Sequence, residues 1–288
     1  MQKIITIIGG QGQMGKLFSR LWQSQEYLVR SLDKDDWSNA QQLLADCNLA
    51  VVCVPIHRTE EVISQITPYL PEHAILADFT SIKATPLQFM LKQHIGPVLG
   101  LHPMFGPSIS SPQNQVIIEC GGRSNYDWVL ESLSHIGFTI VHMGANEHDL
   151  IMSFIQGIEH FSTFVLGSFL RQHQQHPQGL FNLASPIYQA KLTLMGRIFD
   201  QDAKLYADII TADNKRIKLI EEYVHYLQNW ISKLANPEEG AKEFIDEFNQ
   251  TKEWMGEFTH LAQLSSDNFL TAVSNSFVQN DTISSDIK

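Results

Sequence analysis

The first 145 residues alternate short apolar runs with amphipathic segments. Apolar runs of this length, separated by helical segments, are typical of βαβ units and of a mainly parallel sheet. The amphipathic segment 14–24, for example, follows the first apolar run and predicts a helix. We expect strands at residues 4–8, 27–32, 50–54, 74–77, 98–101, 116–118 and 139–141. The pattern therefore predicts a doubly wound α/β domain.

Beyond residue 146 the strand pattern stops and apolar residues recur at helical spacing. Residues 147–172 predict one long helix that is apolar around much of its circumference, so we expect it inside a domain or dimer core. The segments 217–234 and 244–261 repeat apolar residues three and four positions apart, which indicates core-facing helices. The polar end of the chain predicts a disordered tail. We therefore expect an α/β domain at 1–145, an all-helical domain at 146–275 and a disordered tail at 276–288.

Composition and charge exclude several classes of protein. The chain has 288 residues, 43% of them hydrophobic, with 20 basic and 31 acidic residues and a net charge of −11. No basic run offers a face for nucleic acid. Polar residues interrupt the longest apolar stretches before they reach membrane-spanning length. The three cysteines form no CxxC pair and predict reduced thiols, so we expect a soluble cytoplasmic protein with no nucleic-acid, membrane or metal partner.

A dinucleotide-binding signature follows the first predicted strand. The segment 10–15 matches G-x-G-x-x-G, whose glycines permit a tight turn, a close backbone approach to a pyrophosphate and close helix packing. Asp33, 18 residues after Gly15, ends the second predicted strand, where a carboxylate can bind the adenosine ribose. We expect a Rossmann-type domain that binds NAD through Gly10, Gln11, Gly12, Gln13, Met14, Gly15, Asp33, Val54 and Pro55.

The preference for NAD rests on Asp33, because a carboxylate there would repel the 2′-phosphate of NADP. Two alternatives stay open. Asp33 could be an ordinary surface residue at a strand end, and the neighbouring Lys34 could accommodate a phosphate.

Polar residues also follow three predicted strands, at 55–57, 78–83 and 102–107. Ligands of open parallel sheets bind beyond the carboxyl ends of the strands. His102 stands at such an end and could take a substrate proton near neutral pH, although a loop histidine can equally cap backbone groups. His160 lies in the middle of a predicted apolar helix, where a histidine is more often a satisfied core residue.

The motifs together resemble those of prephenate dehydrogenases. The match continues in order up to about residue 270, and it is most similar to the dehydrogenase part of bifunctional chorismate mutase/prephenate dehydrogenases of enteric-type bacteria. The motifs are G-G-Q-G-Q-M-G at 9–15, V-P-I-H at 54–57, D-F-T-S-I-K at 78–83, L-H-P-M-F-G-P at 101–107, F-I-Q-G-I-E-H-F at 154–161, S-P-I-Y at 185–188, M-G-R-I-F-D-Q-D at 195–202 and L-Y-A-D-I-I at 205–210.

The resemblance implies roles for individual residues. His102 matches the catalytic histidine that accepts a hydrogen bond from the C4 hydroxyl of prephenate, and Ser81 matches the serine that orients this histidine and the substrate. Arg197 matches an arginine that holds a substrate carboxylate, for which a planar guanidinium is well suited.

Weaker matches complete the implied substrate pocket. His160 resembles a histidine of that pocket, Lys83 is a second cationic contact, and Tyr206 is a pocket wall. One departure is Ser108, which stands where some relatives carry an acidic residue that gates the pocket, so we carry over no gating role.

The implied function is the oxidative decarboxylation of prephenate to 4-hydroxyphenylpyruvate with reduction of NAD, in tyrosine biosynthesis. We expect a homodimer, because the apolar helices offer more apolar surface than one small domain buries. Tyrosine, which resembles the substrate, is a candidate feedback inhibitor. The chain has no room for a chorismate mutase module, so it is either a monofunctional enzyme or the dehydrogenase portion of a bifunctional one, and we expect the latter. Alternatives are an arogenate dehydrogenase, a β-hydroxyacid dehydrogenase and, from another class, a non-catalytic dinucleotide-sensing protein.

Overall fold

The computed structural model describes residues 2–123 and 125–284. The chain divides into two compact units, which are described separately below. Unit 1 comprises Met1–Ile155 with Ala207–Ala212, and unit 2 comprises Gln156–Tyr206 with Asp213–Lys288. Unit 1 extends past residue 145 because the helix α6 (Ala145–Met152) packs against α4 (Ala84–Gln93) and the strand β6 (Val116–Arg123).

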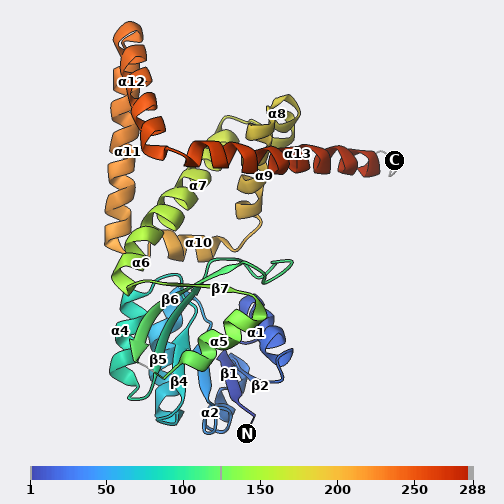
Figure 1. The fold of residues 1–288 in the computed structure, drawn as a ribbon, viewed down its shortest axis with the longest axis vertical. Helices are drawn as coiled ribbons and strands as arrows, with labels where there is room; N and C mark the ends of the chain where they lie inside the picture. The colour runs from blue at the N-terminus through green and yellow to red at the C-terminus, as the bar shows by residue number, and fades with distance from the viewer. Residues whose placement is uncertain (1, 124, 285–288) are drawn as a thin grey trace. The chain divides into compact units, whose positions relative to one another are not determined.

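Unit 1 is built on one sheet, which contains seven strands within the described residues (Figure 1). The other six strands are β1 (Ile4–Ile8), β2 (Leu28–Leu32), β3 (Leu49–Val52), β4 (Ile75–Asp78), β5 (Val98–Pro103) and β7 (Thr139–His142). Their spatial order is β2-β1-β3-β4-β5-β6-β7, and only the β5–β6 pair is antiparallel. The predicted α/β class and Rossmann-type sheet are therefore confirmed. The chain order reverses between β1 and β3, which places the ligand crevice of such a sheet beyond these two strands.

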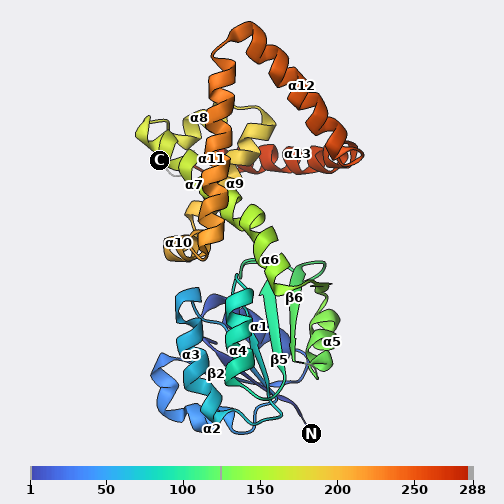
Figure 2. The ribbon, with the colours of Figure 1, turned by 90° about the vertical axis from the view of Figure 1, so that its left-hand side faces the viewer.

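Helices cover both faces of the sheet, as Figures 1 and 2 show for α4 and α5. One face packs against α2 (Ala40–Leu44), α3 (Thr59–Ile66) and α4, and the other against α1 (Gln13–Gln23) and α5 (Asp127–Ile136). Successive strand residues point to opposite faces, so Val51 joins one core and Val52 the other. Apolar side chains on both faces of these strands were the pattern that predicted a sheet covered on both sides. Short 3₁₀ turns lie at η1 (Lys34–Asn39), η2 (Ile56–Arg58) and η3 (Thr67–Tyr69).

Unit 2 is helical throughout its described residues. Its helices are α7 (Glu159–Gln172), α8 (Pro177–Leu183), α9 (Pro186–Phe199), the first part of α10 (Ala203–Ile210), α11 (Asn214–Leu234), α12 (Pro237–Met255) and α13 (Phe258–Ser284). α9 packs against α7, α8 and α13, and α11 packs against α12. Proline opens α8, α9 and α12, a position where its missing N–H has no helical partner to lose.

Two features of the helical region differ from the sequence prediction. The predicted long helix is interrupted by a π-helical segment, Ser153–Ile158, between α6 and α7. Its apolar side chains are not buried within one chain: Leu150 is 61% exposed and Phe169 is 54% exposed. At the other end, α13 continues to Ser284, where a disordered tail was predicted, because a helix already formed adds residues more easily than a new one begins. Residues 285–288 of that predicted tail lie outside the described part.

The helical run Ala145–Gln172 is also long and apolar enough to cross a membrane, judged by length and composition alone. The sequence prediction that every apolar stretch falls short of this length was therefore wrong for this run. Only 17% of its most apolar window is buried inside the chain. The exposed apolar surface needs a covering partner.

Candidate active site

The glycine-rich loop joins β1 to α1 in the predicted position. The backbone N–H of Gln11 donates to both oxygens of the Asp33 carboxylate, at 3.1 and 3.3 Å. A side chain at Gly10 would overlap the hydroxyl of Ser31, and a Cβ at Gly15 would lie 2.5 Å from the carbonyl oxygen of Gly9. The structure thus brings the loop and Asp33 together, and it explains why larger residues do not fit at positions 10 and 15.

A cavity of about 610 Å³ opens at this loop. Its lining includes Gln11 and Gln13 of the loop and three basic side chains, Lys16, Arg20 and Arg30. Lys16 lies in the first turn of α1, where its charge suits a pyrophosphate, whereas Arg20 lies in the last turn and Arg30 on β2 pairs with Asp46. Val54 and Pro55 follow β3, the strand next to β1, and Val54 lies close to the loop, since a Cβ at Gly9 would be 3.2 Å from its Cγ1. These residues fit a bound dinucleotide.

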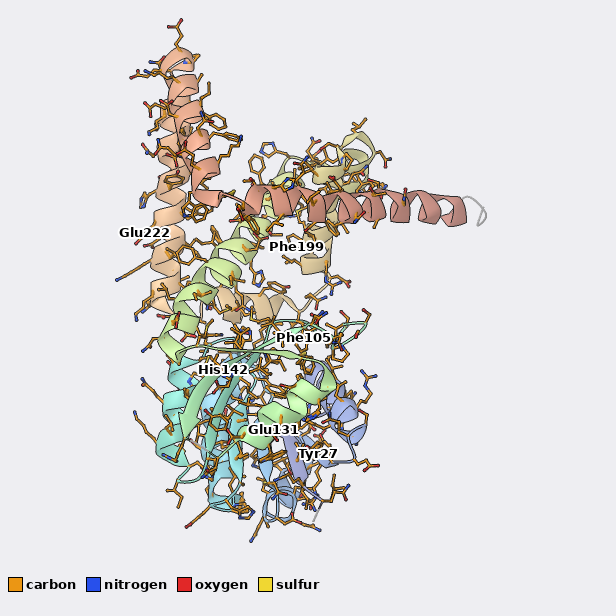
Figure 3. The ribbon with its side chains drawn as sticks, viewed as in Figure 1. Tyr27, Phe105, Glu131, His142, Phe199 and Glu222 are labelled. Carbon is orange, nitrogen blue, oxygen red and sulfur yellow. The ribbon has the colours of Figure 1, made fainter. Side chains whose placement is uncertain are left out.

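Two aromatic side chains fix the loops that follow β4 and β5. Phe79, directly after β4, packs on Phe18 of α1 with ring centroids 4.4 Å apart. Phe105, labelled in Figure 3, follows β5. Its ring stacks on that of Phe138 with centroids 5.1 Å apart and the rings nearly parallel. Such pairs add to the burial of the rings themselves. The packing therefore holds in place the loop that carries Ser81 and the segment that directly follows β5 and His102.

A buried ion pair joins β4 and the start of α4 to β5. The Lys83 ammonium contacts the Asp78 carboxylate, and both side chains have no exposed surface. The same ammonium donates to the carbonyl oxygen of Leu101, the residue before His102, at 2.8 Å. Lys83 was predicted to contact the substrate. In unit 1 its ammonium instead contacts Asp78 of β4 and the carbonyl oxygen of Leu101 in β5. These contacts stabilise β5, the strand that carries His102.

His102 forms the first link of a short hydrogen-bonded chain. Its side chain is buried at the carboxyl end of β5, and its Nδ1 lies 2.8 Å from Nε2 of His148 on α6. His148 Nδ1 in turn lies 2.8 Å from the Asp149 carboxylate. That carboxylate also accepts the backbone N–H groups of Lys83 and Ala84, at 2.7 and 2.9 Å, where α4 begins.

These hydrogen bonds keep Asp149 ionised. Burial by itself would raise the pKa of Asp149, but the hydrogen bonds from His148, Ala84 and Lys83 outweigh it and hold the pKa below its ordinary value. Ser81 is half-buried after β4, and within the described residues the partner of His102 Nδ1 is His148 rather than this serine.

Unit 2 contains the remaining predicted residues. The His160 and Tyr206 rings meet edge to face with centroids 4.8 Å apart. Burial raises the pKa of Tyr206, and the positive charge of Arg197 opposes this rise, so these two side chains are electrostatic neighbours. The structure thus groups His160, Tyr206 and Arg197 within one unit.

The His160 ring is buried without full hydrogen bonding. Burial lowers the pKa of His160, and the nearby Arg216 charge lowers it further, so its imidazole is neutral at pH 7. Among the described atoms its Nδ1 is buried and has no hydrogen-bond partner. Arg216 lies against Gly157 of the π-helical segment, where a Cβ would come within 2.8 Å of its Cγ.

Two family models match the chain. One is described as the prephenate dehydrogenase nucleotide-binding domain and matches residues 24–117; the other is described as the prephenate dehydrogenase dimerization domain and matches residues 144–250. The T-protein of Enterobacter agglomerans is 42% identical over 275 residues, which make up 94% of this chain and 73% of that protein. The T-protein of Haemophilus influenzae is 40% identical over 257 residues, 88% of this chain and 68% of that protein.

This chain belongs to the prephenate dehydrogenase family. The resemblance read from its motifs is confirmed. Among solved structures, the prephenate dehydrogenase of A. aeolicus, determined with hydroxyphenyl propionate and NAD⁺, has a TM-score of 0.68 and 16% identity, covering 88% of this chain and 99% of that one. At this identity the likeness concerns the fold alone, and the prephenate dehydrogenase fold agrees with the sheet and helices described above.

Sequence reasoning about this prephenate dehydrogenase missed three polar residues. His148 and Asp149 were taken as part of an apolar helix, and Arg216 was overlooked within the repeat of α11. A signal was present for the first two, because adjacent His and Asp residues follow the last strand at the start of a helix. The distance to His102, 46 residues earlier, could not be read from the sequence.

Proposed function

We propose that this chain oxidises and decarboxylates prephenate to 4-hydroxyphenylpyruvate, with NAD as the hydride acceptor, in tyrosine biosynthesis. The observation that carries the proposal is the placement of His102. It is buried at the carboxyl end of β5 and hydrogen-bonded through Nδ1, in a unit that also carries a dinucleotide loop. Family membership selects prephenate among the substrates that such an arrangement could oxidise.

NAD is the cofactor that the loop residues fit. Bound NAD supplies the hydride acceptor, while the protein supplies binding, orientation and electrostatics. Gly10, Gly12 and Gly15 leave room for the pyrophosphate at the start of α1. The Asp33 carboxylate, held by the Gln11 N–H, would bind the adenosine ribose and disfavour a 2′-phosphate.

His102 acts on the C4 hydroxyl of the substrate. As hydride leaves C4, the hydroxyl proton passes to the imidazole and a C4 ketone forms. The bond to the ring carboxylate then breaks, CO₂ leaves, and its electron pair makes the ring aromatic with a phenolate at C4. The imidazolium returns its proton to that oxygen, so no net proton is released. His102 is thus base in the first step and acid in the last.

The unit 2 residues are proposed to bind the substrate. The Arg197 guanidinium would pair with a carboxylate, which its planar fork can hold with two hydrogen bonds. His160 has a buried Nδ1 for which a substrate polar group is a suitable partner, and the Tyr206 ring against it would form a pocket wall. Ser81 remains a proposed orienting residue.

A homodimer is the proposed assembly, because residues 144–250 match the family's dimerization domain. Exposed apolar side chains of α7, α9 and α11 line a cavity of about 1030 Å³ in unit 2, which includes Val165, Phe169 and Leu227. A second copy would cover this surface, as an exposed apolar patch of this kind requires.

We further propose a cytoplasmic location. We also propose that tyrosine, which resembles the reaction product, inhibits the enzyme.

The proposal is tested by nicotinamide reduction with the purified chain. Prephenate is supplied with NAD or NADP, and arogenate is tested in parallel. NADH formation with release of 4-hydroxyphenylpyruvate and CO₂ supports the proposal, and the ratio of the two cofactors tests the role of Asp33. Turnover of arogenate but not prephenate would make arogenate, rather than prephenate, the substrate. Inertness towards both would overturn the proposal and direct the search to small hydroxy acids.

A further inference from the structure

His102, His148 and Asp149 form a linear chain of side chains within unit 1. The two imidazoles meet edge to face with ring centroids 5.0 Å apart, and the linking nitrogens are 2.8 Å apart. His102 is 3% exposed and His148 is not exposed at all. Such a buried pair of nitrogens must share one proton, since one has to donate and the other to accept.

The position of that proton follows from Asp149. The ionised carboxylate can only accept hydrogen bonds, so His148 Nδ1 carries a proton and donates it. In its neutral form, His148 then has its lone pair on Nε2 and accepts from His102. His102 therefore carries its proton on Nδ1, and its Nε2 holds the lone pair. This is the tautomer that a general base acting through Nε2 requires.

The surrounding charges favour the same arrangement. Lys83 and Asp78 face this region from α4 and β4, and their charges cancel each other within one ion pair. The Glu119 carboxylate of β6 accepts hydrogen bonds from the N–H of Gly121 and the hydroxyl of Tyr126, and it contacts the His142 ring. The thiol of Cys120 is kept protonated, because burial raises its pKa to about 12. Asp149 is thus the carboxylate whose negative charge acts on the two imidazoles.

We propose that His148 and Asp149 are positioning residues, which hold His102 in the Nδ1–H tautomer and stabilise its imidazolium during turnover. This role for His148 and Asp149 rests on the proposed function in one respect, namely that His102 is the general base. In general-base catalysis a carboxylate often orients a histidine by accepting a hydrogen bond from its Nδ1. Here the imidazole of His148 lies between the carboxylate and the catalytic histidine. Asp149 also accepts the backbone N–H groups at the N-terminus of α4.

The tautomer can be measured without substrate. The chain has 12 histidines, and the ring nitrogens of His102 are assigned by comparing ¹⁵N-histidine NMR spectra of the wild type and His102→Asn. We expect a protonated-type Nδ1 and an unprotonated-type Nε2 at a pH where the ring is neutral. A protonated-type Nε2 in the wild type would overturn the proposal, whatever the enzyme's activity.

Two variants of His148 separate positioning from packing. In His148→Gln an amide oxygen can replace Nε2 as the acceptor, whereas His148→Leu fills similar space and accepts nothing. We expect kcat with prephenate to fall by roughly 10–100-fold in His148→Leu and less in His148→Gln, with the KM values for prephenate and NAD little changed. The acid limb of the kcat/KM profile should move to lower pH in His148→Leu, because the imidazolium loses its link to the Asp149 charge.

A matched control is His142→Gln, which removes another histidine–carboxylate contact of unit 1, at 2.6 Å from Glu119 (Figure 3). It should leave both kcat and the His102 tautomer unchanged. A merely structural role for His148 would lower the amount of folded enzyme without moving the pH profile or the tautomer, and that result would overturn the proposal. If His148→Leu does not fold, the tautomer and pH profile of folded His148→Gln and Asp149→Asn decide. A wild type with the expected tautomer but no turnover of prephenate would instead refute the proposed function alone.

Discussion

His102 combines two properties that a general base needs. Burial at the end of β5 removes competing water, and the hydrogen bond from Nδ1 fixes the orientation of the ring. β5 and the Lys83 contact to Leu101 position the backbone beside His102, and His148 contacts the His102 ring. The geometry of one residue therefore depends on three separate elements of unit 1.

At this residue, we predict that His102→Asn lowers kcat by roughly 10²–10⁴-fold, the usual contribution of a positioned acid or base. Asn retains a donor near Nδ1 but has no group that titrates near neutral pH. Steady-state NADH formation with prephenate measures the effect, and NAD affinity measured by fluorescence titration serves as the folding control. Unchanged kcat in a variant that binds NAD normally would remove His102 from the mechanism.

The elements β4, β5 and α4 are fastened to one another by charged side chains in the interior. Asp78 and Lys83 join the loop after β4 to β5, and Asp149 of α6 binds the first N–H groups of α4. Buried charges are tolerated only when they are paired and hydrogen-bonded. These contacts stabilise the carboxyl edge of the sheet, where His102 lies, so their loss should be felt both in stability and in turnover.

For the buried ion pair, we predict that Lys83→Met destabilises the protein by about 3–5 kcal/mol, because the Asp78 carboxylate would remain buried without its partner. Urea unfolding of variant and wild type gives this difference. The control is Arg30→Met, which breaks the exposed pair with Asp46 and should cost less than about 1 kcal/mol. A raised KM for prephenate with unchanged stability would instead favour the predicted substrate contact of Lys83.

For the link between α6 and α4, we predict a pH-dependent contribution of Asp149. Its pKa is lowered in the folded state, so the stabilisation is fully present above the unfolded carboxyl pKa of about 3.9 and is lost as pH falls through the lower folded value. Asp149→Asn should cost about 1–3 kcal/mol at pH 7. Urea unfolding at pH 7 and pH 3 tests this, since the difference from wild type should shrink in acid; a constant difference would contradict it.

At the scale of the whole molecule, the helical unit leaves large apolar side chains uncovered. The run Ala145–Gln172 is apolar enough for a membrane span, but all of it lies within the matched dimerization domain at 144–250. Contact with a second copy of the chain would therefore explain why this apolar surface is exposed in one copy, and no membrane is needed to explain it. The long helix lies where the sequence predicted it, and our hypothesis is that a partner chain buries its apolar residues.

We predict a dimer with a mass of twice 32.7 kDa in light scattering. Phe169→Asp places a charge in the apolar cavity of unit 2 and should shift the mass towards 32.7 kDa. Ile95→Asp, at an exposed apolar position of unit 1, is the control and should remain dimeric. A wild-type mass of 32.7 kDa at micromolar concentration would refute the dimer.

The sequence by itself determined the sheet, the dinucleotide loop with Asp33, and the family. These follow from local patterns: buried strands carry apolar residues on both faces, and glycines are required where a side chain would collide with the backbone or with Ser31. Strand and helix periods are likewise readable over a few residues, which is why the predicted strands agree closely with the observed ones.

Only the tertiary structure decided which polar groups meet. The antiparallel pairing of β5 with β6, the enclosure of Lys83 by Asp78, and the contact of His102 with His148 join residues whose separation along the chain carries no information about distance. A hydrogen bond needs two atoms placed within a few tenths of an ångström, and that placement results from the packing of α4, α6 and β5 together. The proton on His102, and with it the proposed chemistry, is therefore a property of the fold rather than of the motif.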